Sequence, residues 1–144
     1  ASENDIKSFS MTGQRRDLNR EKFKLENLLS VLNNPESNAN KNLKYLRNAM
    51  DVRSKLKQFH PSSEMKCLSK DRTDIVVVKR GKGPKAIFAI HNMTDYKINY
   101  QLNDNDLSQI FGNEFNMQDF LTSTKYNLKN ISLDPFQVIW LGSL

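Results

Sequence analysis

The run Ile-Val-Val-Val-Lys at positions 75–79 is followed by Gly-Lys-Gly-Pro at 81–84 and by Ala-Ile-Phe-Ala-Ile-His at 86–91. β-Branched residues favour strands, and glycine and proline favour turns. Two apolar runs separated by such a turn predict an antiparallel β-hairpin. This hairpin sets the fold class of the second half of the chain.

Further strands are expected on both sides of the hairpin. Residues 65–68 are a short candidate, and residues 97–102 alternate Ile98, Tyr100 and Leu102 with polar side chains, which is typical of a half-buried strand. Residues 127–133 and 136–141 complete the set, joined by Asp134-Pro135. Short strands spaced by turns predict an antiparallel sheet or a small β-sandwich over residues 61–144.

The first part of the chain has a helical period. Leu25, Leu28, Leu29 and Leu32 are spaced to form one stripe on a helix, which should end before Pro35. A second helix is expected over residues 40–59, stopped by Pro61. Residues 1–20 are polar and predict a long loop. The fold class expected for this chain is therefore α+β.

Composition excludes several classes of protein. The 144 residues carry a formal net charge of +6, but their basic residues form no run with interleaved aromatics, so nucleic-acid binding is not favoured. Cys67 is the only cysteine, which excludes an internal disulfide and a cysteine metal cluster. We find no apolar run of membrane-spanning length and no signal peptide, and expect a cytoplasmic protein without a metal or cofactor.

Three other residues and two short motifs have a functional and a structural interpretation. His60 precedes Pro61 and is interpreted as structural, and His91 is expected at the surface. Trp140, with Phe136 and Ile139, could form a sugar-stacking platform, but an aromatic residue on the last strand of a small sandwich favours the core. The Asn-x-Ser/Thr motifs at Asn92 and Asn130 are interpreted as chance products of an Asn-rich chain.

Positions 12–20 read Thr-Gly-Gln-Arg-Arg-Asp-Leu-Asn-Arg. This string resembles the G-x-x-R-D-I-N-R signature of the sucrose phosphorylase group of glycoside hydrolase family 13, in the α-amylase superfamily. The preceding Ser-Glu-Asn-Asp at 2–5 looks like the x-x-N-D that follows the last barrel strand in that group. Leu46, Arg53 and His60-Pro61 look like the helix that closes the barrel, and residues 133–141 resemble the L-x-P-Y/F-x-V-x-W-L strand of its β domain.

The resemblance implies a specific architecture and reaction. Residues 1–60 would be the last βα loop and the closing helices of a (β/α)8 barrel, and residues 61–144 a C-terminal antiparallel β domain. The parent enzyme would be a retaining glycoside phosphorylase, a glycosyltransferase that moves glucose from sucrose or a glucosylglycerate-like α-glucoside to inorganic phosphate. The family's catalytic Asp and Glu would precede residue 1, so this chain alone should hold no catalytic residue.

Arg16 aligns with the arginine that reaches the glucosyl unit in the family, and its guanidinium can hold sugar hydroxyls. The alternative is a loop arginine paired with Asp17 or Asp5. Gln14, Arg15 and Asp17 are weaker substrate-binding candidates, while Asn19 and Arg20 more simply shape the loop. The acceptor (fructose, fructose phosphate, glycerate or glycerol) is left open.

Two alternatives come from other functional classes. The chain could be a non-catalytic sugar-binding or structural β module, or a basic nucleic-acid binder. The other partner expected for the phosphorylase is the missing barrel portion of the same protein. The leucine stripe of residues 25–32 should be exposed in this chain, so self-association into a homo-oligomer is also expected.

Overall fold

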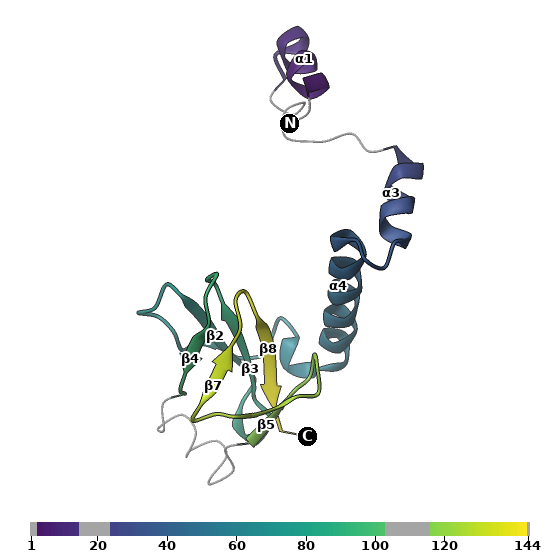
Figure 1. Cartoon of the computed structure of the whole chain (residues 1–144). Coiled ribbons are helices and arrows are strands. Elements are labelled where there is room, and N and C mark those ends of the chain that lie inside the picture. The colour runs from purple at the N-terminus through teal and green to yellow at the C-terminus, as the bar shows by residue number, and fades with distance from the viewer. Residues whose placement is uncertain (1–2, 15–23, 103–115, 144) are drawn as a thin grey trace. The chain divides into compact units, whose positions relative to one another are not determined.

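The computed structural model describes residues 3–14, 24–102 and 116–143. The chain divides into two compact units, residues 1–46 and 47–144, and each is described by itself. Helices and antiparallel sheets are both present, as the α+β prediction requires (Figure 1). The barrel origin of residues 1–60 and the domain boundary after residue 60 stay predictions.

The first unit begins with a helix where a loop was predicted. Helix α1 covers Glu3–Thr12, with Glu3 in its first turn, where a carboxylate interacts well with the helix dipole. Gly13 ends it at φ +67°, and its N–H donates to the Phe9 carbonyl at 2.7 Å. The loop prediction was wrong here because serine and threonine residues interrupt the helical spacing of apolar side chains. Ser10 and Thr12 bond back to carbonyls within the helix, which satisfies their hydroxyls.

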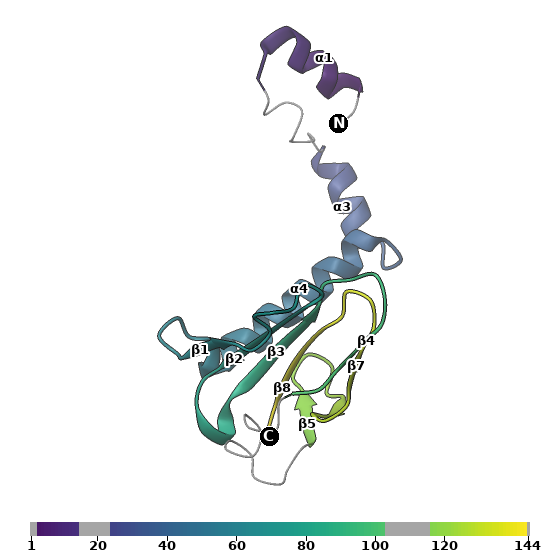
Figure 2. The same ribbon diagram turned by 90° about the vertical axis from the view of Figure 1, so that its left-hand side faces the viewer.

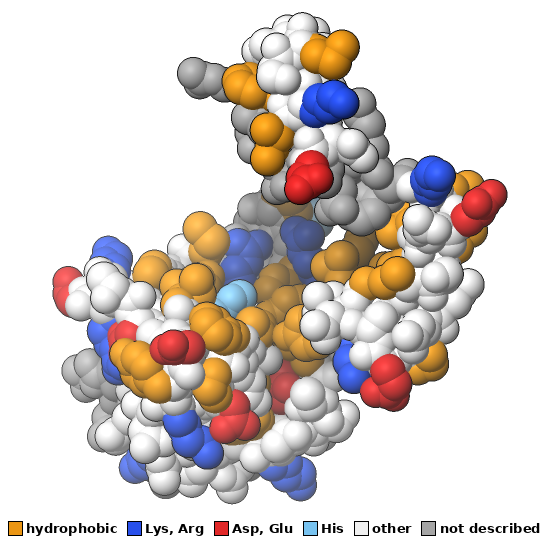
Figure 3. Space-filling model, turned by 45° about the horizontal axis from the view of Figure 1, so that its top comes forward, with side chains coloured by type: hydrophobic (Ala, Val, Ile, Leu, Met, Phe, Trp, Pro, Cys, Tyr) orange, Lys and Arg blue, Asp and Glu red, His pale blue; other side chains and the backbone are white. Residues whose placement is uncertain are grey.

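Helix α3, Leu25–Asn33, has the bounds that the leucine spacing predicted. Asn34 takes an extended conformation before Pro35, which ends the helix as expected. No residue of α3 is buried, and Leu25, Leu29 and Val31 are among its exposed side chains. Figure 3 shows apolar side chains open at the surface of the helical segment. The exposure predicted for the leucine stripe is confirmed.

Helix α4, Asn38–Lys55, starts two residues earlier and ends four residues earlier than the predicted helix. Ser37 caps its start, because the Ser37 hydroxyl accepts the Asn40 N–H at 3.1 Å. At its end Leu56 is extended, and a short 3-10 turn, Lys57–Phe59, follows. The Arg80 guanidinium donates to the Gln58 and His60 carbonyls at 3.1 and 2.7 Å. These carbonyls are bound to the sheet, which explains why the helix does not continue.

The second unit is built on two antiparallel sheets. The larger has the order β1-β2-β3-β8-β5-β6, and the smaller pairs β4 with β7. Figure 2 shows β4 and β7 to one side of β2, β3 and β8. The strands are β1 (Met65–Cys67), β2 (Ile75–Arg80), β3 (Ile87–Asn92), β4 (Ile98–Tyr100), β5 (Asn116–Asp119), β6 (Lys125–Asn127), β7 (Ile131–Leu133) and β8 (Val138–Gly142).

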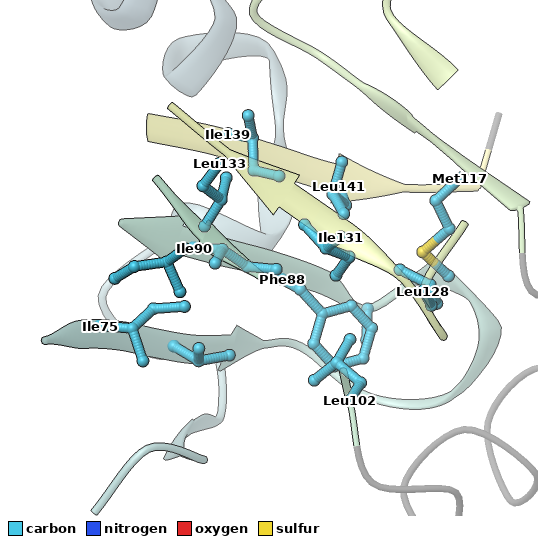
Figure 4. Packing of buried hydrophobic residues seen from close by; sticks show 13 residues of the cluster. Ile75, Phe88, Ile90, Leu102, Met117, Leu128, Ile131, Leu133, Ile139 and Leu141 are labelled. Carbon is cyan, nitrogen blue, oxygen red and sulfur yellow. The ribbon is translucent and has the colours of Figure 1, made fainter. Parts of the chain in front are cut away.

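The predicted hairpin is confirmed. Strands β2 and β3 pair antiparallel from Ile75 opposite Asn92 to Arg80 opposite Ile87, and β8 adds to the other edge of β3. The core lies between the two sheets, where side chains from both point toward one another (Figure 4). Its fully buried members include Ile75, Val77, Phe88, Ile90, Leu102, Leu128, Ile131, Leu133, Ile139 and Leu141.

The opposite face of the larger sheet carries Trp140, which the sequence analysis assigned to the core. Trp140 is half-buried and alternates with the buried Ile139 and Leu141, so it points away from the core cluster. Its ring lies 4.6 Å from the Phe59 ring, centroid to centroid. The Asn48 amide also donates to the Leu121 carbonyl at 3.0 Å. The end of α4 and the 3-10 turn are therefore attached to the β unit.

Two strand predictions need correction. Residues 127–133 are not one strand, because the Asn127 side chain accepts the Lys129 N–H and its carbonyl accepts the Asn130 N–H, which closes a turn. The chain passes there from β6 in the larger sheet to β7 in the smaller one. Strand β5 was missed because its Asn-Met-Gln-Asp sequence lacks the residues that favour strands.

Asp119, at the end of β5, is a completely buried carboxylate. Its Oδ1 accepts the backbone N–H groups of Leu121 and Trp140 at 3.1 and 2.8 Å, and its Oδ2 accepts the Thr122 hydroxyl at 2.6 Å. One side chain thus holds the β5–β6 turn against β8. A buried acceptor that satisfies three donors is costly to remove, because each donor is left without a partner.

The exposed stripe of α3 predicts that the isolated 16.7 kDa chain forms oligomers or aggregates. Replacing Leu25 and Leu29 by Glu should shift the chain toward monomer, because two charges then interrupt the apolar surface. Light scattering coupled to size exclusion measures the mass, and Asn27→Glu on the same helix is the control. A monodisperse wild-type monomer would contradict the prediction.

Asp119→Ala should lower the free energy of unfolding by about 3 kcal/mol, because three donors lose their acceptor. Asp119→Asn should lose less, since its carbonyl oxygen can still accept the two backbone N–H groups. Urea unfolding at neutral pH measures both, with the exposed Asp95→Ala as control. If Asp119→Ala lowers the free energy of unfolding no more than Asp95→Ala does, the hydrogen bonds of Asp119 do not contribute to stability.

Candidate functional site

The candidate substrate-binding loop begins where α1 ends. Gln14 is exposed, and its N–H donates to the Thr12 hydroxyl at 3.3 Å, so the Gly13 turn directs the chain out of the helix. Arg15, Arg16 and Asp17, with Leu18, Asn19 and Arg20, lie outside the described residues. The substrate roles of Gln14, Arg15, Arg16 and Asp17 therefore stay predictions.

A hollow of about 450 Å³ lies at the C-terminal end of α4, lined by Ser54, Leu56, Lys57, His60, Ser62 and Ser63. The hydroxyls of this hollow are engaged within the chain. Ser54 donates to the Asp51 carbonyl, Ser63 to the Lys57 carbonyl, and the Ser62 hydroxyl lies 2.7 Å from His60 Nδ1. His60 also accepts the Ser62 N–H, so the prediction of a structural histidine is confirmed.

His91 is half-buried, which corrects the surface position expected for it. On β3 it lies opposite Val76 of β2 and Val138 of β8. Burial among these aliphatic neighbours disfavours the imidazolium and lowers the pKa of His91. The alternation of the strand could have shown this, because His91 shares a face with Ala89 and Ile87.

Arg72 and Asp74 form a two-point ion pair in the turn before β2. Arg72 Nε donates to Asp74 Oδ1 at 2.8 Å, and Arg72 Nη2 donates to Asp74 Oδ2. The guanidinium carbon lies 5.7 Å from the centre of the Tyr100 ring, within range of a cation–π interaction. The hydrogen bond from Arg72 lowers the pKa of Asp74, and the same bond raises the pKa of Arg72.

Asn92 is the centre of a network that the sequence analysis missed. Its amide nitrogen donates to the carbonyls of Tyr96 and Asp134 at 2.7 and 2.9 Å. Its oxygen accepts both the N–H and the hydroxyl of Thr94. The side chain is buried and fully used, so the Asn-x-Thr spacing at 92–94 marks a turn motif that joins the loops after β3 and β7.

The described part of the chain has neither a cluster of metal ligands nor a membrane-spanning helix. Residues 3–14, 24–102 and 116–143 contain no group of three or more His, Cys, Asp or Glu side chains placed to hold a metal ion. Within the same ranges, no helix is both long and apolar enough to cross a bilayer.

No family model matches the chain. It is 34% identical over 94 residues to a glucosylglycerate phosphorylase from Allomeiothermus silvanus. The matched residues are 65% of this chain but 17% of the phosphorylase, so the chain spans only a small part of that relative. The likeness confirms the resemblance to glycoside phosphorylases drawn from the sequence motifs.

Two solved structures share the fold. AmyP, crystallised with maltose, matches 73% of this chain with a TM-score of 0.58 at 18% identity. The trehalose-6-phosphate hydrolase of Bacillus licheniformis matches 78% with a TM-score of 0.50 at 19% identity. The chain covers 21% and 19% of these proteins, respectively. At such identities the comparison supports the fold alone.

The Arg72–Asp74 pair predicts acid-sensitive stability. The pKa of Asp74 is lower in the folded protein than in the unfolded chain, so its stabilisation is present above about pH 4 and is lost as the pH falls through the folded pKa. Asp74→Asn should therefore lower the melting temperature at pH 7 and have a smaller effect near about pH 2.

Thermal unfolding across this pH range measures the difference. Asp51→Asn removes the exposed pair of Asp51 with Lys55 on α4 and serves as the control. An Asp74→Asn effect that is the same at both pH values would show that ionisation of Asp74 does not contribute.

Proposed function

Because the chain is related to a glycoside phosphorylase, we propose that it is the C-terminal portion of a retaining enzyme that transfers glucose from an α-glucoside to inorganic phosphate. The donor would be sucrose or a glucosylglycerate-like compound, and the product α-glucose 1-phosphate. The observation that carries the proposal is the 34% identity to the glucosylglycerate phosphorylase over 94 residues. That relative also favours glycerate as the acceptor.

In this proposal the chain contributes one loop to the active site. Arg16, in the Arg-Asp-Leu-Asn-Arg string, donates hydrogen bonds from its guanidinium fork to hydroxyls of the glucosyl unit. Gln14, Arg15 and Asp17 border the same site. Helix α1 and its Gly13 cap directly precede these residues in the sequence.

The catalytic carboxylates of the proposed enzyme lie outside this chain. A retaining mechanism needs a nucleophile and an acid/base whose carboxyl groups are about 5–5.5 Å apart. The nucleophile forms a covalent glucosyl-enzyme while the acid protonates the leaving oxygen, and phosphate then displaces the enzyme carboxylate. Two displacements at the same carbon retain its configuration. The 144-residue chain alone should therefore have no activity.

The exposed leucine stripe supports a partner within the same enzyme. Leu25 and Leu29 are 68% and 47% exposed, although the helix period places them on one face. An apolar helix face normally lies against another element. We assign the barrel portion of the proposed enzyme as the surface that covers it, with residues 1–60 as the last loop and closing helices.

The test is phosphate-dependent release of glucose 1-phosphate by an enzyme that carries this chain joined to a barrel portion. Glucosylglycerate and sucrose are compared as donors, each with and without phosphate. Arg16→Ala should lower kcat/KM by about a hundredfold, the equivalent of one or two charge-assisted hydrogen bonds. Lys7→Ala on the exposed surface of α1 is the control.

Hydrolysis that does not respond to phosphate would reject the phosphorylase proposal. An Arg16→Ala enzyme with the activity of the Lys7→Ala control would reject the role of Arg16 alone. Glucose 1-phosphate release by the isolated chain would reject the assignment of the catalytic groups to the barrel.

A further inference from the structure

Two loops at one end of the larger sheet expose aromatic side chains. Residues 93–97 connect β3 to β4 and carry Tyr96, which is 56% exposed. Residues 134–137 connect β7 to β8 and carry Phe136, which is 65% exposed. Large aromatic side chains usually bury most of their surface, so two on neighbouring loops need an explanation.

The two loops are held together by hydrogen bonds, several of them made by the buried side chain of Asn92. The Asn92 amide bonds the Tyr96 carbonyl in one loop and the Asp134 carbonyl in the other. The Phe136 N–H donates to the Thr94 carbonyl at 3.0 Å, and Lys97 Nζ lies 3.3 Å from Asp134 Oδ1. Both aromatic residues therefore project from backbone that is fixed before any ligand arrives, which lowers the entropic cost of binding.

Phe136 adopts a backbone conformation that is unfavourable for its residue type. Its φ is +54°, a region that glycine and asparagine tolerate and bulky residues avoid. Burial does not compensate this strain, because most of the Phe136 side chain is exposed. Such strain persists where the surroundings impose it, and it clusters at binding sites.

The surroundings of the rings indicate the chemistry of the ligand. Thr94, Asp95, Lys97 and Asp134 flank the aromatic residues, and the Lys97–Asp134 pair is itself largely exposed. A dry apolar partner would have to desolvate this ion pair, which is unfavourable. A pyranose ring is suited to both features, because its C–H face packs on an aromatic ring and its hydroxyls bond to charged groups and to water.

We propose that Tyr96 and Phe136 form a carbohydrate-binding platform that stacks pyranose rings of an oligosaccharide. The platform belongs to the β unit, outside the Gln14–Arg20 loop, and it does not depend on the phosphorylase proposal. It would bind a glucose oligomer at the surface of the β unit.

The test is calorimetric titration of the 144-residue chain with maltoheptaose, a neutral glucose oligomer. Wild-type chain should bind with a Kd on the order of 1 mM. Tyr96→Ala and Phe136→Gly should each weaken binding by about tenfold, because each removes one stacking ring. Glycine at 136 also relieves the positive φ, so this variant should fold at least as stably as wild type.

Three controls keep the result specific. Met93→Ala removes an exposed side chain of the same loop that is not aromatic, and it should leave binding unchanged. Phe136→Tyr keeps a ring and should retain binding. Lys7→Ala, on the exposed surface of α1, should also leave binding unchanged.

Several outcomes would overturn the platform. These are no heat of binding with wild type, equal binding by wild type and both ring-deletion variants, or a loss of binding in Met93→Ala as large as the loss in those variants. In a further outcome, wild-type chain binds no sugar but forms dimers, which Tyr96→Ala and Phe136→Gly convert to monomers. That outcome would assign the loops to a protein contact.

Discussion

Strand β3 is buried on both faces, and the rest of the β unit follows from this constraint. Ile87, Phe88, Ala89 and Ile90 are successive and all buried, although successive side chains in a strand point to opposite faces. Such a strand needs hydrogen-bond partners along both edges and cover on both sides. Strands β2 and β8 pair with the two edges of β3, and the β4–β7 pair covers the face that carries Phe88 and Ile90.

The other face of β3 connects the β unit to the segment before it. Trp140 of β8 packs on Phe59, and the Gln58 amide donates to the Lys85 carbonyl at 2.7 Å. Arg80 completes the attachment by binding two carbonyls of the same segment. The segment after α4 is therefore fixed by side chains of the sheet rather than by its own helix propensity. This explains why the helix pattern in the sequence ran past the true end of α4.

The sequence predicted elements whose pattern is local and missed those fixed by distant contacts. Apolar runs and leucine spacing were sufficient for β2, β3 and α3. Helix α1, strand β5 and the turn at Asn127 are polar, and their hydrogen bonds become visible only in three dimensions. Phe136 was placed with the core because aromatic residues usually lie there. For the candidate site, the motif around Arg16 comes from resemblance alone, because neither period nor composition distinguishes a substrate arginine from a solvated one.

The position of β8 has a consequence for how the protein folds during synthesis. The central strand β3 acquires its second edge only from residues near the C-terminal end of the described chain, so this pairing is strongly non-local. Until those residues leave the ribosome, β3 presents an open apolar edge to other chains. Lys79, Arg80, Lys82 and Lys85 surround the hairpin turn, and such charges discourage intermolecular pairing. These basic residues therefore also reduce the risk of aggregation during the time in which β3 has no second partner strand.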